Sequence, residues 1–271
     1  MSVEATMKYD PEKFWAERYR ESDITKSGHV DLPVAYNDWL YRRKKERLLA
    51  GLRKAGFRPE GASVLEIAAG TGVYVDMWKS LGVGRLSGID ISENATKALK
   101  KRFPEYSFVK RDLAEPGLTE VTGADYDLVT AVDVLYHIVN DEDFAVALGN
   151  LAEACRPGGF LAIHDFFTHH LEMDFGYIKM RTLKDYRAAL DKAGIEIVSR
   201  TPTFFLTVQT YDYASLATKK RMDKVWSRFI QPFIERKPEL AGRLGYWSDR
   251  ILGSILSEGP SYEMMICRRK V

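Results

Sequence analysis

The sequence lacks the features that mark disulfide-rich, metal-binding or membrane-spanning proteins. It has only two cysteines, Cys155 and Cys267, and no CxxC pair or metal-ligand spacing involves them, so we expect two buried free thiols. No apolar run approaches the length of a membrane span. The first residues, MSVEATMKYDPEKFW, lack the basic start and apolar core of a signal peptide. We therefore expect a cytoplasmic protein with no membrane partner.

An excess of one charge is also missing. The chain has 40 basic and 38 acidic residues and a formal net charge of +2, so no overall basic field calls for nucleic acid or an acidic membrane. We expect no nucleic-acid partner. The length of 271 residues suits one sizeable α/β domain with an appendage. The sequence gives no firm indication of the oligomeric state.

What the sequence does contain is a regular alternation of strands and helices. Apolar strands are expected at about 63–67, 85–90, 107–110 and 127–133, and helices at about 72–82, 93–103 and 141–155. Strands that recur about every 20 residues indicate βαβ units and a mainly parallel sheet. The strands FLAIHDF and IEIVSRT follow, with a helix at about 182–193 between them, and YEMMICRR ends the chain.

Two further segments have a helical pattern of their own. Residues 10–55 begin with a good helix start and carry an interrupted apolar stripe, and residues 203–260 form longer runs rich in Trp, Phe, Arg and Lys. The predicted organisation is an N-terminal helical arm (1–55), a core (56–202), a helical lid insertion (203–260) and a final core strand (261–271).

The stretch VLEIAAGTG carries the first chemical signal. An apolar strand places Glu66 at its end, where a ligand's polar groups would lie, and then turns into a helix through Gly70 and Gly72. Glycines let the backbone approach a ligand closely. A nicotinamide-binding turn prefers a third small residue where this chain has Val75, which disfavours that cofactor without excluding it.

Two more carboxylates follow the next two strands. Asp90 ends the second strand, where an acidic side chain can accept both ribose hydroxyls, and Asp112 follows the third, where it can accept from an adenine amino group. Each alone is equally well interpreted as a solvated or helix-capping residue. Three carboxylates at successive strand ends together favour a nucleoside-binding edge.

These segments resemble the ordered motifs of class I S-adenosylmethionine-dependent methyltransferases. The matching stretches are VLEIAAGTG, GIDIS, KRDL, AVDVLYHI and RPGGFLAIHD. The resemblance implies a seven-stranded, mainly parallel Rossmann-like sheet with helices on both faces and an antiparallel last strand. It also implies S-adenosylmethionine as cofactor and S-adenosylhomocysteine as product.

The resemblance assigns cofactor roles residue by residue. The residues of the strand end and glycine turn (Glu66, Ala68, Gly70 and Gly72) are implied to surround the methionine part of the cofactor. Asp90 and Ile91 are implied to contact the ribose, and Asp112 and Leu113 the adenine. Asp133 and Val134 are implied to line the sulfonium side. Ala68 stands where the family usually has its first glycine, so a slight shift of the cofactor is expected. The residues implied to bind the cofactor are Glu66, Ala68, Gly70, Thr71, Gly72, Asp90, Ile91, Asp112, Leu113, Asp133 and Val134, with Trp15 and Tyr19 from the N-terminal arm.

A hydroxyl acceptor would benefit from a general base, and His137 is the first candidate. It lies in the loop after the fourth strand and resembles the catalytic histidine of many small-molecule O-methyltransferases, although histidine here can also only brace the cofactor loop. His164 and Asp165, with His169 and His170 beyond, form a second cluster. It is interpreted as an acid/base pair, a divalent metal site or plain polar lining, and no metal is predicted because the spacing matches no strong ligand motif.

Acceptor specificity is expected to come from the arm and the insertion. The predicted substrate contacts are Tyr36, Trp39, Tyr136 and His169, although Tyr36 and Trp39 are equally consistent with docking of the arm. Base-amino methylation is disfavoured because Asp133 is followed by Val-Leu-Tyr, and cytosine C5 chemistry because Cys155 lacks a preceding proline. The excess of basic residues at 203–260 indicates solvated helix faces or an anionic acceptor.

The predicted function is methyl transfer to a small-molecule acceptor, most simply a hydroxyl oxygen, with a histidine base. Transfer to nitrogen or carbon remains an alternative, as does an RNA or protein methyltransferase that uses the basic lid and the run Arg42-Arg43-Lys44-Lys45. A non-catalytic cofactor-binding module and a nicotinamide oxidoreductase are the alternatives from other classes.

Overall fold

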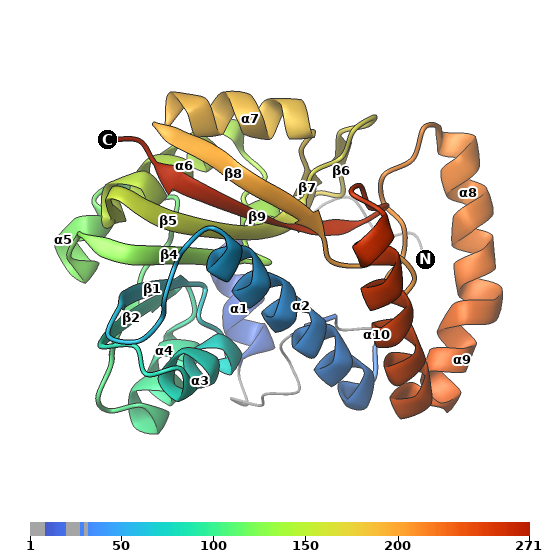
Figure 1. The fold of residues 1–271 in the computed structure, drawn as a ribbon, viewed down its shortest axis with the longest axis horizontal. Helices are drawn as coiled ribbons and strands as arrows, with labels where there is room; N and C mark the ends of the chain where they lie inside the picture. The colour runs from blue at the N-terminus through green and yellow to red at the C-terminus, as the bar shows by residue number, and fades with distance from the viewer. Residues whose placement is uncertain (1–8, 20–27, 30–31) are drawn as a thin grey trace.

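The structure, a computed structural model, describes residues 9–19, 28–29 and 32–271. A twisted seven-stranded sheet lies between two layers of helices (Figure 1). Its strand order is β3-β2-β1-β4-β5-β9-β8, and β9 runs antiparallel to both of its neighbours. The strands are β1 (Ser63–Ile67), β2 (Arg85–Asp90), β3 (Ser107–Lys110), β4 (Tyr126–Val132), β5 (Cys155–Phe166), β8 (Ile195–Pro202) and β9 (Tyr262–Arg269). The predicted Rossmann-like sheet with an antiparallel last strand is confirmed.

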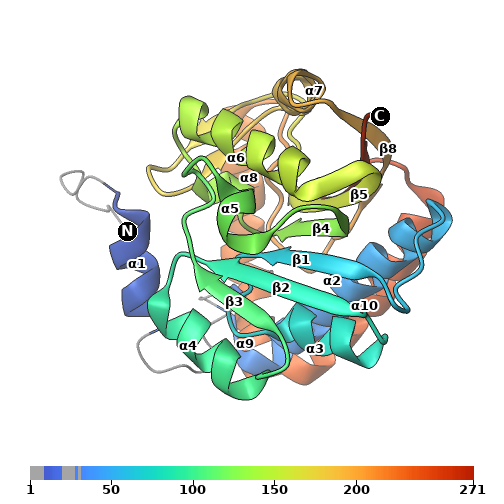
Figure 2. The same cartoon turned by 90° about the vertical axis from the view of Figure 1, so that its left-hand side faces the viewer.

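Helices cover both faces of the sheet, with α2, α3 and α4 on one side and α5, α6 and α7 on the other (Figures 1 and 2). They are α1 (Pro11–Arg18), α2 (Val34–Lys54), α3 (Val73–Ser80), α4 (Glu93–Arg102), α5 (Leu118–Thr122), α6 (Asp141–Ala154), α7 (Leu183–Lys192), α8 (Leu216–Val225), α9 (Gln231–Arg236) and α10 (Pro238–Ile255), with a 3-10 turn η2 (Leu135–His137) and a π-helical turn η3 (Trp226–Ile230).

Two hydrophobic clusters follow from the alternation of side chains along each strand. Val64 packs with Leu48 of α2 and Trp78 of α3, whereas its neighbour Leu65 packs with Leu148 of α6 on the opposite face. Successive strand residues point to opposite faces, so a strand buried on both sides is apolar throughout. This explains why the core strands appear in the sequence as continuous apolar runs.

The predicted helical segment at 10–55 is divided in the structure. Its described residues hold two helices, α1 and α2, because Gly28 adopts a φ of +96° and Pro33 precedes α2 with φ −58° and ψ 148°, which is not a helical conformation. Asp10 caps α1 by accepting the Lys13 backbone N–H at 3.1 Å. The part of the prediction at 20–27 and 30–31 lies outside the described residues.

The predicted insertion folds as α8, η3, α9 and α10, and α10 packs directly on α2. The two helices approach closely at glycines: a Cβ on Gly242 would lie 2.3 Å from the Trp39 ring, and one on Gly253 would lie 1.9 Å from the Arg47 guanidinium. The lid role of the insertion stays a prediction.

The helix α5 and a small hairpin were not predicted. The hairpin strands are β6 (Met173–Asp174) and β7 (Lys179–Met180), and the turn between them has Gly176 at φ +82° with its N–H donating to Asp174 Oδ1 at 2.7 Å. None of the helices in the described part is long and apolar enough to cross a membrane.

Candidate active site

The turn between β1 and α3 forms the first part of the site. Ala68 and Gly70 each have a φ of +53° and Gly72 a φ of +82°, so three residues of this turn are left-handed. Glycine adopts this conformation readily, whereas alanine pays about 1–2 kcal/mol. The backbone N–H of Ala69 donates to the Ile89 carbonyl at 3.0 Å, which fixes the turn against β2. The turn holds its shape although alanine occupies the usual glycine position.

Asp90 lies beneath this turn at the end of β2. Its carboxylate accepts the Gly70 N–H and the Ser92 N–H, each at 2.8 Å. Burial raises the pKa of Asp90 to about 6, although the two hydrogen bonds lower it. A carboxylate has about four lone-pair directions, so ribose hydroxyls can still be accepted beside the two backbone groups.

Glu66 occupies a different place from the one predicted. Its Oε2 accepts the Trp78 indole N–H at 2.9 Å and the Thr130 hydroxyl at 2.5 Å, and its side chain is buried. Burial raises the pKa of Glu66 to about 7, and the two hydrogen bonds lower it. Glu66 therefore anchors the end of β1 to α3 and β4, which corrects the expectation that it faces the ligand.

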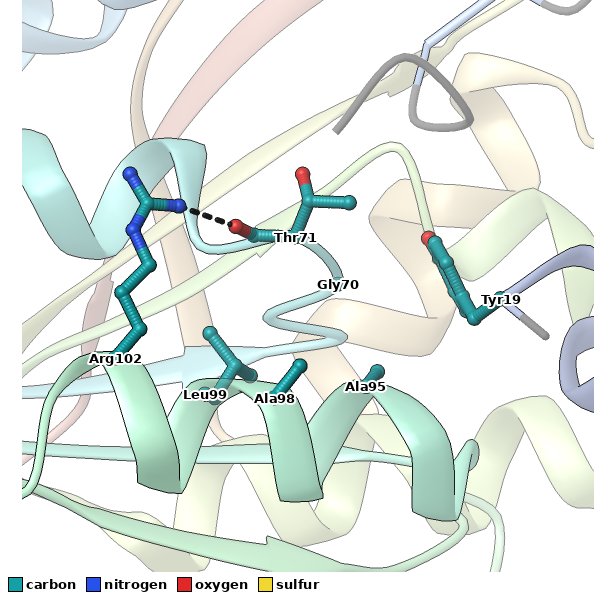
Figure 3. Close-up of a pocket in the computed structure, with 7 residues that line it drawn as sticks. All are labelled: Tyr19, Gly70, Thr71, Ala95, Ala98, Leu99 and Arg102. Atoms are coloured by element: carbon teal, nitrogen blue, oxygen red, sulfur yellow. Dashed lines mark hydrogen bonds between the residues drawn. The ribbon is translucent and has the colours of Figure 1, made fainter. Parts of the chain in front are cut away.

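A hollow lies between the glycine turn and α4 (Figure 3). Gly70 and Thr71 form one side, Tyr19 directly after α1 faces them, and the Thr71 carbonyl accepts from Arg102 at 2.9 Å. The hollow measures about 80 Å³, whereas small-molecule sites are typically about 300–1,000 Å³. Because Tyr19 forms one wall, an outward movement of α1 would enlarge it.

The residues assigned to the adenine end lie beside α1. Asp112 accepts the Ala114 N–H at 2.9 Å, and burial raises its pKa. Burial raises the pKa of the Tyr9 hydroxyl to about 12, with a smaller raising contribution from Asp112. Leu113 is buried after β3, and Ile91 is half-buried after β2. A buried hydroxyl, two carboxylates and a glycine-containing turn at one sheet edge fit a nucleoside cofactor.

Comparison with known families decides between the predicted classes. The family model described as a methyltransferase domain matches residues 39–200, which is more than half of the chain. The chain belongs to this methyltransferase family. The enzyme is an S-adenosylmethionine-dependent methyltransferase, as the sequence predicted, and a nicotinamide oxidoreductase is no longer an alternative.

Solved structures with the same fold are distant in sequence. Magnesium protoporphyrin IX methyltransferase from Synechocystis, determined with bound SAM, is 15% identical with a TM-score of 0.56, and the match covers 99% of this chain and 100% of that one. The N-methyltransferase NodS from Bradyrhizobium japonicum is 14% identical with a TM-score of 0.56, covering 94% and 97%. Among curated proteins none matches. At these identities the likeness shows the fold and not the acceptor.

The other half of the sheet edge holds a buried ionic cluster around Asp133. Asp133 follows β4 with a φ of +58°; one carboxylate oxygen binds the Lys44 ammonium and the other binds His164 Nδ1 at 2.5 Å. Burial alone would raise the pKa of Asp133, but Lys44 and His164 outweigh it and hold the pKa well below its usual range. The methyltransferase thus carries an ionised carboxylate next to the predicted sulfonium position.

His164 has both ring nitrogens engaged. Nδ1 donates to Asp133, so Nε2 carries a lone pair and accepts the Thr203 hydroxyl at 3.2 Å. Its side chain is fully buried and stacks on Tyr262 with ring centroids 5.3 Å apart. Burial lowers the pKa of His164, although Asp133 raises it. This geometry suits a residue that orients Asp133.

His164 and Asp165 do not form an acid/base pair with each other, which was one of the three interpretations of this cluster. Neighbouring residues of a strand point to opposite faces, and Asp165 accepts the Tyr186 hydroxyl and the Phe166 N–H on the far side of the sheet. Burial raises the pKa of Asp165 to about 8, against the hydrogen bonds that lower it. Asp165 therefore has a structural place under α7. Among the described residues, no group of three potential metal ligands lies close together.

His137 lies in η2, and among the described residues only its Nδ1 has a hydrogen-bond partner. Its Nδ1 donates to the Tyr177 carbonyl at 3.1 Å, and a carbonyl can only accept, so the lone pair is on Nε2. The Trp15 ring of α1 meets the imidazole edge-on at 5.0 Å. Burial lowers the pKa of His137 to about 4, although Tyr177 and Asp133 raise it. The imidazole is therefore neutral at pH 7.

The four predicted substrate residues do not lie together in the structure. The Tyr36 hydroxyl donates to the Thr207 carbonyl at 2.7 Å and Trp39 packs on Gly242 of α10, so both dock the insertion. His169 is exposed at the surface, where it pairs with Asp212 at 2.6 Å. Only Tyr136 remains in the site, with its ring 4.4 Å from that of His137. Tyr36 and Trp39 thus take the docking position that was the alternative for them, His169 lies at the surface, and the substrate role of the four residues stays a prediction.

Several residues of the site were missed by sequence reasoning. Lys44 comes from α2, His29 packs edge-on against Tyr262 at 5.6 Å, and the Tyr74 hydroxyl is buried without a partner near Asp133. Burial lowers the pKa of His29 to about 4, and Lys44 lowers it further. No motif marks these positions, because a buried lysine and a lone histidine have no spacing signature.

The basic run Arg42-Arg43-Lys44-Lys45 is not an exposed patch. The side chains of Arg43 and Lys44 are 2% and 3% exposed, and Arg43 donates to the backbone carbonyls of Thr203 and Asp249 at 3.2 and 2.8 Å. This removes much of the support for a polyanionic acceptor on α2.

Proposed function

We propose that this methyltransferase transfers the methyl group of S-adenosylmethionine to a hydroxyl oxygen of a small-molecule acceptor, with His137 as general base. The observation that carries the proposal is the hydrogen bond from His137 Nδ1 to the Tyr177 carbonyl, which leaves the lone pair on Nε2. A hydroxyl must lose its proton as it becomes a nucleophile, and a neutral imidazole within reach can accept that proton.

The surroundings of His137 support the same role. The cofactor supplies an electrophilic methyl group, so the chain has mainly to align the acceptor and remove its proton. Trp15 covers the imidazole from α1 and limits access of water. Asp133 is close enough to raise the pKa of His137 and so favours the protonated imidazole after proton transfer. His164 is the weaker candidate, because neither of its nitrogens is available.

The test is an assay of purified protein with methyl-labelled S-adenosylmethionine and a panel of small alcohols, phenols, amines and carbon acids. The proposal expects S-adenosylhomocysteine release with hydroxyl acceptors and a product whose labelled methyl carbon has the chemical shift of an ether or ester. NodS is an N-methyltransferase with this fold, so nitrogen is the alternative acceptor. Products methylated only on nitrogen or carbon would reject the hydroxyl assignment.

A further inference from the structure

The outer side of α10 carries an apolar stripe that no described residue covers. Leu240, Leu244, Trp247, Ile251 and Ile255 follow one another at intervals of three or four residues, so they share one helix face. They are between 38% and 74% exposed. The opposite face of α10 packs on α2, as the close approach at Gly242 and Gly253 shows. The helix is thus apolar toward solvent as well as toward the protein.

The preceding helical segment has the same character. Met222, Val225, Phe229 and Phe233 follow at spacings of three and four through α8, η3 and α9, and each is more than 40% exposed. Neither α8 nor η3 has a buried residue. Isolated exposed apolar residues are normal, but two successive helices with apolar outer faces mark an interaction surface. We call the exposed side of residues 216–255 the outer face.

Basic side chains are interleaved with these apolar residues. Lys220, Arg221, Lys224 and Arg228 are exposed in α8 and η3, and four more basic side chains are exposed between 236 and 250, in α9, α10 and the residue that joins them. Only Glu235 and Glu239 are exposed acidic residues in 216–255, so the exposed side chains carry eight positive and two negative charges, a net +6. The whole chain has a formal charge of +2, which conceals this local excess.

We propose that the outer face docks on the surface of an anionic lipid bilayer. Helices that lie in a membrane interface combine Trp, Phe and Leu with Lys and Arg, because apolar side chains enter the acyl boundary while basic ones meet the headgroups. A second copy of the chain would bring two faces of like charge together, so the charge favours lipid over self-association. The expectation of no membrane partner rested on the absence of a membrane-spanning run and of a signal peptide and on the net charge of the whole chain, none of which describes a helical face that lies on a bilayer surface. It does not depend on the identity of the methyl acceptor.

Flotation of the full chain with vesicles tests the proposal. The vesicles are phosphatidylcholine alone or phosphatidylcholine with about one third phosphatidylglycerol, in low and high salt. We expect at least about tenfold stronger partitioning to the anionic vesicles, and loss of this preference in high salt. Brominated lipids should quench the fluorescence of Trp247, and the Trp247→Phe variant should lose most of that quenching.

Matched variants separate the outer face from the rest of the surface. We expect the quadruple variant Lys220→Gln, Arg221→Gln, Lys224→Gln, Arg228→Gln and the double variant Leu244→Ser, Ile251→Ser each to lower partitioning at least about tenfold. The control variant Lys100→Gln, Lys101→Gln, on exposed positions of α4, should bind like the wild type. Thermal unfolding of each variant checks that its fold is intact.

Two results would overturn the proposal. One is equal partitioning to neutral and anionic vesicles with no effect of the charge variant. The other is absence of vesicle binding together with self-association that Leu244→Ser, Ile251→Ser abolishes, which would make the outer face a contact between copies.

Discussion

The two halves of the carboxyl edge of the sheet are built in different ways. We call the part around the glycine turn and Asp90 the cofactor half, and the part around Asp133 and His137 the acceptor half, each after the role proposed for it. In the cofactor half, the Asp90 carboxylate accepts backbone N–H groups from residues 2 and 20 positions away. In the acceptor half, Lys44 reaches Asp133 across 89 positions and Arg43 reaches Thr203 across 160. The cofactor half depends on a local turn, whereas the acceptor half depends on the assembly of α2, β5, β8 and β9. Substitutions in the two halves should therefore have different effects, on cofactor binding in the cofactor half and on stability or turnover in the acceptor half.

The largest effect is expected from His137→Ala. Loss of a general base typically lowers kcat about 10²–10⁴-fold and leaves S-adenosylhomocysteine affinity nearly unchanged. The base must be unprotonated, so activity falls as the pH drops through its pKa. Since burial lowers that pKa to about 4, the acid limb of kcat/KM in the wild type should lie below about pH 5. Steady-state kinetics across pH measure the loss of kcat in the variant and the acid limb of kcat/KM in the wild type.

The matched control for His137 is His169→Ala, because His169 is exposed and outside the site. It should keep wild-type turnover. If His137→Ala also kept near-full turnover with saturating acceptor, His137 would only brace η2, and an amine or carbon nucleophile activated by proximity would replace the hydroxyl.

A loss of stability is the next expected effect, from Lys44→Met. Removing one partner of a buried ion pair leaves the other charge uncompensated and typically costs about 3–5 kcal/mol. The side chain of Lys44 is 3% exposed, so water cannot replace it easily beside Asp133. Urea unfolding measures the change in the free energy of unfolding.

Lys54→Met at the end of α2 is the control, since Lys54 is exposed and should change stability by less than about 0.5 kcal/mol. The double variant Lys44→Met, Asp133→Asn should recover part of the loss because no charge is left unpaired. Equal stability of the Lys44 and Lys54 variants would show that the cluster contributes nothing to the fold.

In the cofactor half, Asp90→Ala should act on binding. Hydrogen bonds to a charged group are worth about 1.5–3 kcal/mol, so titration calorimetry should show S-adenosylhomocysteine affinity weakened by that amount. Asp90→Asn, which keeps an acceptor for Gly70 or Ser92, should lose less. The surface variant Asp191→Ala serves as control. Unchanged affinity in Asp90→Ala would exclude the ribose role.

The cofactor half was largely predictable from sequence because its physics is local. A strand, a glycine turn and an acid at the next strand's end are adjacent in the chain, and parallel topology brings them to one edge. Glu66 is the exception: its identity gave no indication that Trp78 and Thr130 would turn it into the core. That contact depends on side-chain packing across β4 and α3.

The acceptor half could not be predicted in the same way. Lys44 lies in a basic run that resembles a solvated face, but α2 turns it toward the sheet, where it binds Asp133 and lies 6.0 Å from the Tyr262 ring of β9. His164 and Asp165 invite pairing because they are adjacent in sequence, although strand geometry separates them. Side chains alternate between the two faces of any strand, so this rule, applied to FLAIHDF alone, already places the two residues on opposite sides of the sheet.

The smallest effect is expected from Thr203→Val. This variant tests whether His137 acts as the general base while His164 only orients Asp133. Valine has the shape of threonine without the hydroxyl, so His164 Nε2 loses its hydrogen-bond donor while the packing at β8 is kept. An unmet buried hydrogen bond costs about 1 kcal/mol or somewhat more, which urea unfolding can resolve. If His164 only orients Asp133, the bond from Nδ1 to Asp133 stays in place and kcat should change by less than about threefold. Thr201→Val, two residues earlier in β8 and half-buried, is the control for the substitution itself. A fall in kcat of about 10²-fold in Thr203→Val alone would mean that a proton passes through Nε2, and the general base would then have to be reassigned from His137 to His164.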